Sequence, residues 1–274
     1  MFKPYIFKFS LFFALLTGPL TGLALAPSFN VSVESEWGNA DIQDVQAVLN
    51  SVGVVISPYT GGRRLDNIIV RNAPKGPISL YQRGENGEYI VLLDIKGRYW
   101  SQLAYQYSHE VCHLLSNYDL APNNITQQQW FEESLCEAFS LFALKQMAVH
   151  WQENPPYPNW KAYSADLQRY VDGMLQEKHR HLATPVSEWY RQQKNVLERD
   201  PYAQDRRLNE KMATALLEIF EENPENWVAM NYLNLGEDTG THSMEKYLAD
   251  WYSNTPDAYR GVVAKIQQLL TAPQ

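Results

Sequence analysis

The sequence is poor in cysteine and in positive charge. Only two cysteines occur among 274 residues, so a framework of several disulfides is excluded. A chain of this length buries a substantial core without such links. Lysine and arginine number 23 against 31 aspartates and glutamates, which gives a net charge of −8. A chain this acidic is not predicted to bind nucleic acid through bulk electrostatics. No period that would indicate a helical-repeat architecture is evident.

The longest apolar run stands at the N-terminus. Lys3 and Lys8 accompany an apolar stretch at Phe9–Leu16, and the small-residue sequence Ala24-Leu25-Ala26 follows. This order is typical of a secretory signal peptide over residues 1–26, and a proline after the last alanine leaves the cleavage position open. An uncleaved membrane anchor is the alternative, but glycines and a proline interrupt a span that is barely long enough. We expect an exported protein, periplasmic or secreted, without stable membrane insertion after signal cleavage.

The most informative segment reads His109-Glu110-Val111-Cys112-His113. It lies within Trp100–Leu115, where apolar residues recur at helical spacing and no glycine or proline interrupts. On a helix, His109 and His113 occupy one face and can direct two imidazoles at one metal ion. Glu110 lies about 100° further round the helix, within reach of a water molecule at that ion.

A second predicted helix, Gln127–Met147, supplies a third ligand candidate. Glu133 lies there, within Trp130-Phe131-Glu132-Glu133-Ser134-Leu135-Cys136-Glu137. Three protein ligands and one open position are typical of a catalytic zinc site, whereas structural sites have four closed ligands. Two core helices with incidental histidines are the competing interpretation, but unpaired histidine and glutamate side chains are costly to bury. The pattern therefore predicts one Zn²⁺ ion.

These two segments resemble those of the gluzincin metallopeptidases, which include thermolysin-like and aminopeptidase-like enzymes. That family has His-Glu-x-x-His and, about twenty residues later, Asn-Glu-x-x-x-Glu/Asp on a second helix. Glu132 stands where the family has asparagine and is therefore a second ligand candidate, but the Trp-x-x-Glu frame and the spacing favour Glu133. The resemblance implies that His109, His113 and Glu133 hold zinc and that Glu110 is the general base. It covers only these two segments and identifies no subfamily.

The same helix pair predicts two further features. If the helices are antiparallel, Glu137 approaches the far nitrogen of His109 and fixes its tautomer; a solvated surface carboxylate is the alternative. Cys112 and Cys136 each follow a ligand candidate by three positions and so share one angular offset. They form either a disulfide or two small buried apolar residues. Export to an oxidising compartment favours the disulfide.

The predicted fold class is α+β. Residues 27–98 show strand patterns around an amphipathic helix at Asp41–Leu49 and a hairpin turn at Glu85–Glu88. One of the two hairpin strands could be the sheet edge that pairs with an extended peptide. The strand patterns are Phe29–Val33, Val54–Ser57, Asn67–Val70, Ile78–Gln82 and Tyr89–Ile95. Helical patterns follow a proline-rich turn at 153–158, at about 160–177, 185–198, 205–222, 241–252 and 256–270.

The expected organisation has three parts. A signal peptide at 1–26 precedes a zincin-like catalytic region at 27–150, in which a small α/β sheet leads into the active-site helix pair. A mainly α-helical region at 151–274 follows.

Two weaker predictions concern residues outside the motif. Zincins usually add a tyrosine or histidine donor for the tetrahedral oxyanion. Tyr202 is the first candidate because it precedes a helix start, and Tyr232 and His242 are alternatives, although each also fits a structural role. His179 and His181 indicate a second metal site only weakly, because no carboxylate support is evident, and a surface loop is expected there.

Together these features predict an exported zinc-dependent peptidase that acts on peptide or protein substrates. The ion would activate a water molecule and polarise the scissile carbonyl. Glu110 would take the proton of that water and deliver it to the leaving amine. Internal and N-terminal cleavage both stay open. The competing hypothesis is an exported, non-catalytic zinc-binding interaction protein that retains the fold. Glu110 argues against it, because such a site needs no base.

Overall fold

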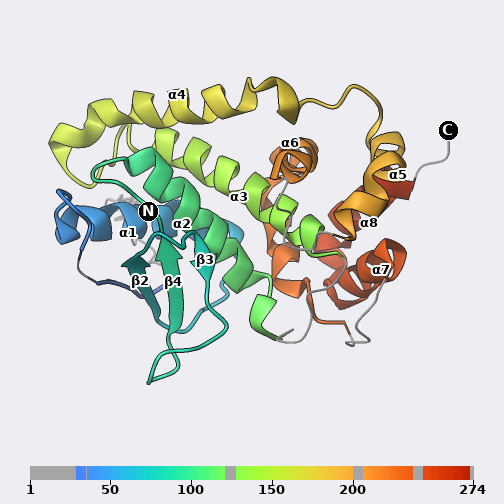
Figure 1. The fold of residues 1–274 in the computed structure, drawn as a ribbon, viewed down its shortest axis with the longest axis horizontal. Coiled ribbons are helices and arrows are strands. Elements are labelled where there is room, and N and C mark those ends of the chain that lie inside the picture. The colour runs from blue at the N-terminus through green and yellow to red at the C-terminus, as the bar shows by residue number, and fades with distance from the viewer. Residues whose placement is uncertain (1–28, 35, 121–127, 200–205, 237–242, 272–274) are drawn as a thin grey trace, which may run out of the picture.

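The computed structural model describes residues 29–34, 36–120, 128–199, 206–236 and 243–271. The predicted signal peptide at 1–26 lies outside these ranges, as do Tyr202 and His242. A small sheet with one flanking helix leads into two long helices, and further helices complete the chain (Figure 1). The predicted α+β fold class is confirmed.

Four short strands form one sheet in the order β1-β2-β4-β3. The strands β1 (Val31–Val33), β2 (Ile68–Asn72) and β4 (Tyr89–Leu93) are parallel, and β3 (Ile78–Ser79) pairs antiparallel with β4. The central strands are rich in valine, isoleucine and leucine, as expected for strands that contribute to a core. The short strand β3 forms one edge of the sheet, so its outer side faces no other strand of the described chain.

The helix α1 (Ile42–Ile56) begins at an N-cap in which the Asp41 carboxylate accepts a hydrogen bond from the Gln43 amide. It continues through Val54–Ile56, so the predicted strand at Val54–Ser57 is wrong. Val52, Val55 and Ile56 are all buried, at the three- and four-residue spacing of one helix face. That spacing extends the helix, and a short apolar run alone cannot distinguish helix from strand.

Helices dominate the remainder of the described chain. The two that carry the predicted metal ligands are α2 (Trp100–Leu115) and α3 (Gln129–His150). The other α-helices are α4 (Ser164–Leu175), α5 (Val186–Leu197), α6 (Arg206–Glu222), α7 (Met244–Asn254) and α8 (Arg260–Thr271). Short 3₁₀ helices are η1 (Ser57–Tyr59), η2 (Tyr118–Leu120), η3 (Pro158–Tyr163), η4 (Lys178–Arg180), η5 (Pro224–Tyr232) and η6 (Asp257–Tyr259).

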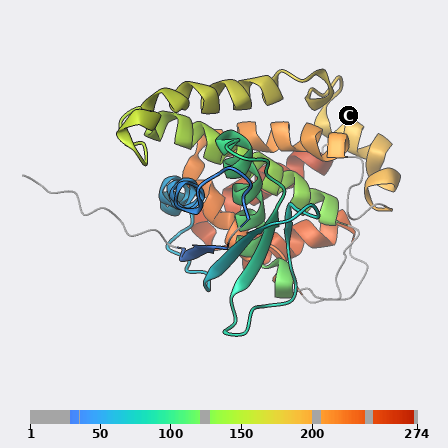
Figure 2. The ribbon, with the colours of Figure 1, turned by 60° about the vertical axis from the view of Figure 1, so that its left-hand side comes forward.

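The helix α2 lies between the sheet and α3 (Figures 1 and 2). It packs against α1, β3 and β4 on one side and against α3 on the other. The helices α4 and α6 pack in turn against α3. The ligand helices are therefore held from both sides, by the sheet layer and by the C-terminal helices.

Aromatic packing ties these helices into one core. The Trp227 ring of η5 stacks on Phe220 of α6, with ring centroids 3.9 Å apart, and contacts Phe139 and Phe142 of α3. All four side chains are almost completely buried. One hydrophobic cluster thus extends from the sheet to α8. Each described helix is too short or too polar to span a membrane.

Candidate metal centre

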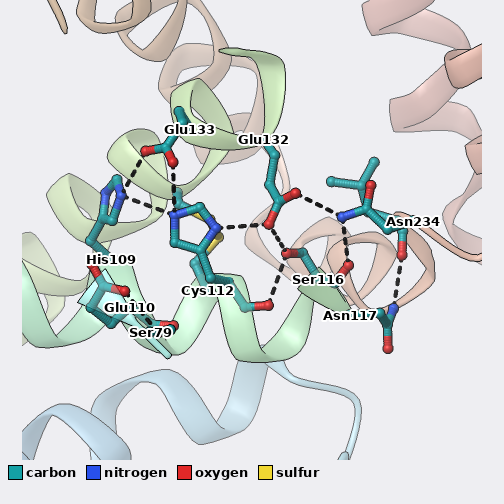
Figure 3. A network of polar contacts seen from close by, with 12 residues as sticks. Ser79, His109, Glu110, Cys112, Ser116, Asn117, Glu132, Glu133 and Asn234 are labelled. Atoms are coloured by element: carbon teal, nitrogen blue, oxygen red, sulfur yellow. Dashed lines mark hydrogen bonds and ion pairs between the residues drawn. A yellow bond between two sulfur atoms is a disulfide. The ribbon is translucent and has the colours of Figure 1, made fainter. Parts of the chain in front are cut away.

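The histidine pair lies on a regular, uninterrupted helix. His109 and His113 are one turn apart on α2, and their rings face each other with centroids 4.9 Å apart. Glu133 approaches them from the first turns of α3 (Figure 3). The structure therefore brings the three predicted ligands together.

The donor atoms of these residues form a small triangle. The Nε2 atoms of His109 and His113 are 3.2 Å apart. The carboxylate of Glu133 has Oε2 at 3.2 Å from Nε2 of His109 and Oε1 at 3.5 Å from Nε2 of His113. Atoms bound at about 2.0–2.1 Å to one tetrahedral zinc ion would be about 3.3 Å apart. The spacing of the three residues thus fits a zinc ion.

Hydrogen bonds alone do not account for the short separations in this triangle. A neutral imidazole has one N–H and one lone pair, and a carboxylate only accepts. If both Nε2 atoms carry hydrogen, the His109–His113 contact brings two hydrogens together. If only one does, the other nitrogen turns a lone pair towards Glu133. A cation among these four atoms satisfies all three contacts at once.

The second nitrogen of His113 is fixed by Glu132. Its Nδ1 atom lies 2.7 Å from Oε1 of Glu132, and both side chains are buried. Glu132 in turn accepts hydrogen bonds from the Ser116 hydroxyl at 2.7 Å and from the Asn234 amide at 2.8 Å (Figure 3). A proton on Nδ1 leaves the Nε2 lone pair directed at the site. Glu132 is therefore a partner of a ligand, and Glu133 occupies the ligand position.

The hydrogen bonds that hold Glu132 extend to the C-terminal helices through Asn234. Tyr247 of α7 donates a hydrogen bond from its hydroxyl to Oδ1 of Asn234 at 2.8 Å. Asn234 has a φ angle of 58°, in the left-handed region that asparagine tolerates better than most residues. The sequence reasoning missed Ser116 and Asn234. The position of Ser116, three residues after His113, could have indicated the former, whereas nothing in the local sequence indicates Asn234.

The predicted contact between Glu137 and His109 is wrong. The Glu137 carboxylate instead accepts hydrogen bonds from the Tyr105 hydroxyl and from Nη1 of Arg180, the latter at 2.8 Å. Arg180 is 1% exposed and comes from η4, more than forty positions along the chain. A buried guanidinium needs a carboxylate partner, and Glu137 supplies it.

The predicted disulfide between Cys112 and Cys136 is present. Both residues are completely buried where α2 and α3 pack together. Each cysteine lies close in sequence to a ligand candidate, His113 on α2 and Glu133 on α3. The bridge thus holds the two ligand helices together beside the donor triangle.

Glu110 is in position to act as a base. Its carboxylate accepts a hydrogen bond from the Ser79 hydroxyl of β3 at 2.7 Å, and the residue is almost fully buried. Burial raises the pKa of Glu110, although the nearby His113 and His109 and the Ser79 hydrogen bond oppose this shift. Burial therefore shifts the pKa of the Glu110 carboxyl towards that of a stronger base.

The charges of the ligand residues depend on one another. Burial opposes ionisation of Glu133, but His113 and His109 prevail and lower the pKa of its carboxyl. Burial also opposes protonation of His113, but the carboxylates of Glu133 and Glu132 raise the pKa of its imidazole well above the usual value. Both shifts have one cause, since a protonated His113 and the Glu133 carboxylate favour each other's charged form.

The donor triangle opens into a cleft of about 230 Å³. One wall comes from the edge strand β3 and the residues around it, and the other from the start of α6. The lining residues outside the motif are Pro77, Ile78, Ser79, Tyr81, Tyr118, Gln129, Arg206, Asn209 and Glu210. Tyr202 and His242 lie outside the described residues, and Tyr232 is not among the residues that line the cleft. The described tyrosines in the cleft are Tyr81 and Tyr118.

A second group of possible ligands surrounds His179. Its Nε2 atom contacts Glu210 and lies 3.6 Å from Glu177, so the expectation that it lacks carboxylate support is wrong. The buried Arg180 already pairs with both of these carboxylates, however. His181 is not part of this group. The local positive charge of Arg180 makes this group a poor cation site.

Comparisons with known proteins return nothing for this chain: no known protein family, curated protein or solved structure matches it. The function must therefore be argued from the centre itself.

Proposed function

We propose that this protein is an exported, zinc-dependent peptidase of the gluzincin type, which hydrolyses peptide bonds in peptide or protein substrates. The donor triangle of His109, His113 and Glu133, with separations of 3.2–3.5 Å, carries the proposal. Glu110 beside this triangle distinguishes a catalytic centre from a structural one.

One zinc ion would be held by Nε2 of His109, Nε2 of His113 and the carboxylate of Glu133. Such an ion supplies Lewis acidity, which polarises a carbonyl and makes water more acidic. His113 is kept in the ligand tautomer by its hydrogen bond to Glu132. The chain itself thus sets both the position and the protonation state of this ligand.

Glu110 would act as the general base and then as the general acid. Its carboxylate takes a proton from the attacking water and transfers it to the nitrogen of the departing amine, so that the proton balance closes within one turnover. Ser79 donates to Oε2 of Glu110 and so fixes the orientation of this carboxylate. Burial helps, because a raised pKa makes the carboxylate a better proton acceptor.

The substrate would lie in the cleft between β3 and α6. The outer side of β3 is a free strand edge within the described sheet, and an extended peptide can pair with such an edge. Ser79 belongs to this strand and also contacts Glu110. A peptide paired with β3 therefore passes directly beside the base.

The disulfide supports the assignment to an exported protein. Disulfides form and persist in oxidising compartments, such as the periplasm or the extracellular space. The Cys112–Cys136 bridge is buried beside the proposed centre. This agrees with the signal-like sequence at residues 1–26.

Two measurements on purified protein test the proposal. Elemental analysis should find about one zinc per chain, and His113→Ala should lose it. Glu110→Gln should keep the zinc and the fold, while its hydrolysis of a mixed peptide library falls by roughly 10²–10⁴-fold. Glu153→Gln, in an exposed turn after α3, is the matched control and should cut as the wild type does.

The outcomes separate the two parts of the proposal. Full zinc retention in His113→Ala would refute the ligand assignment. A folded, zinc-loaded wild type that cuts nothing across a broad library would favour a non-catalytic zinc-binding protein. If Glu110→Gln cuts as fast as the wild type, the base is another residue.

A further inference from the structure

The α6 wall of the cleft presents polar groups that the proposed chemistry does not use. Arg206, Asn209 and Glu210 all line the cleft, and their three- and four-residue spacing places them on one face of α6. Glu210 is occupied, since its carboxylate contacts His179 and lies 3.5 Å from Arg180. Arg206 and Asn209 are left for a ligand.

Arg206 is an exposed cation that lines the cleft of the proposed centre. It has no ion pair with any residue that the structure describes, whereas Arg180 pairs with Glu137, Glu177 and Glu210. A guanidinium offers five N–H donors in a planar fork that matches a carboxylate. Arg206 is therefore a suitable partner for an anionic group that enters the cleft.

Asn209 is a buried polar residue of the same cleft wall. The residue is 5% exposed, lines the cleft, and makes no side-chain hydrogen bond with the described part of the chain. Its Oδ1 atom is buried without a partner. Buried polar atoms are normally satisfied, so this oxygen is an exception in the structure. An amide can serve a peptide either as donor or as acceptor.

The neighbouring charges permit an anion here. The cleft also contains Glu133 and Glu210, which would repel a carboxylate if they were unpaired. Glu133 faces two imidazoles, and Glu210 faces His179 and Arg180. Each of these acids is thus compensated locally, and Arg206 is left without an ion pair among the described residues.

We propose that Arg206 forms a subsite that binds a carboxylate of the peptide substrate. This inference rests on the proposed function and specifies its substrate class. The cleft is also lined by Ile78 and Tyr81, which are 44% and 45% exposed and offer an apolar surface. The preferred peptide therefore has an apolar side chain towards β3 and a carboxylate towards α6. That carboxylate belongs either to the peptide's C-terminus or to an aspartate or glutamate.

The test measures binding, so that it does not depend on turnover. Zinc-loaded Glu110→Gln protein is titrated with three dansyl-labelled octapeptide pools. The first has a free C-terminus and no acidic residues, the second is the same pool amidated, and the third is amidated but contains glutamate. At least one carboxylate pool should bind about tenfold or more tightly than the neutral pool. The preferred pool identifies the source of the carboxylate.

Variants then assign the preference to α6. Adding Arg206→Ala should remove the preference, whereas Arg207→Ala, the adjacent exposed arginine outside the cleft lining, should leave it unchanged. Equal binding of all pools, or no binding, overturns the subsite. A preference that persists in Arg206→Ala also overturns it, because the metal centre itself would then bind the carboxylate. A preference that depends on Arg206 in a protein without peptidase activity would retain the subsite and reject the proposed function.

Discussion

His113 has the most completely determined surroundings of any residue in the centre. One ring nitrogen faces the donor triangle, and the other is held 2.7 Å from Glu132. Glu132 is itself held by Ser116 and Asn234. The geometry of one ligand therefore depends on side chains that would never contact the ion.

Glu132→Ala is expected to lower the zinc affinity by about 10–100-fold, because His113 loses the partner that fixes its tautomer. Competition with a zinc chelator measures this change. Glu137→Gln is the matched comparison, since the sequence also predicted a supporting role for Glu137. Its carboxylate contacts Tyr105 and Arg180 instead, so zinc affinity should be unchanged in that variant. The opposite ranking of the two variants would contradict the assignment.

The stability of the protein should depend on pH in opposite ways with and without zinc. The folded-state pKa of His113 is raised despite burial, through Glu133 and Glu132. In metal-free protein this favours the fold below the unfolded value of about 6.5, and the contribution is lost as pH rises through the folded pKa. Zinc needs neutral imidazoles and so binds better at higher pH.

Melting temperatures of zinc-loaded and chelator-treated protein between about pH 5 and about pH 9 test this dependence. The difference between the two forms should grow as pH rises. His113→Ala protein is the control, and its two samples should melt alike at every pH. A constant difference for the wild type would mean that His113 does not titrate with metal binding.

At the scale of elements, the disulfide joins the two ligand helices. Cys112→Ala together with Cys136→Ala should lower the free energy of unfolding by about 3 kcal/mol, because the open chain regains the entropy that the closed loop had lost. Urea denaturation with and without a reductant measures this. Reductant should destabilise the wild type and leave the double variant unchanged. Equal stability of the two proteins in the absence of reductant would show that the bridge contributes nothing.

The long helices could be predicted from the sequence because their patterns are extended. The predicted helix at 205–222 agrees with α6 to within a residue, and the predicted helix at 185–198 agrees with α5 equally well. Short apolar runs carried less information. The run at Val54–Ser57 became the end of α1, and the strand predicted at Ile78–Gln82 shortened to Ile78–Ser79.

The ligands of the centre could be predicted because they follow helix periodicity within two segments. The helices alone decide where His109, His113 and Glu133 point. The surrounding residues could not be predicted in this way. Glu137 was drawn away by Arg180, and Glu132 is held by Asn234, which lies 102 positions further along the chain. Contacts over such separations leave no trace in local spacing.

At the scale of the whole molecule, Arg180 links α2, α3 and α6. Its guanidinium pairs with Glu137 of α3, which also holds Tyr105 of α2, and lies 3.5 Å from Glu210 of α6. Arg180→Ala should destabilise the protein by about 3–5 kcal/mol, because Glu137 would stay buried without its cation. Chemical denaturation measures this change. Arg169→Ala, which breaks an exposed pair with Asp166, should cost less than about 1 kcal/mol. Similar values for the two variants would contradict the structural role of Arg180.

The hydrogen bond from Asn234 to Glu132 has a consequence for the order of events during biosynthesis. His109, His113 and Glu133 leave the ribosome well before Asn234, and the gap from Glu132 is 102 residues. At about 5–20 residues per second this gap lasts roughly 5–20 s. During that time the nascent chain has its ligands but lacks the group that steadies Glu132. A chain that ends before Asn234 therefore contains the ligand residues without the group that steadies Glu132.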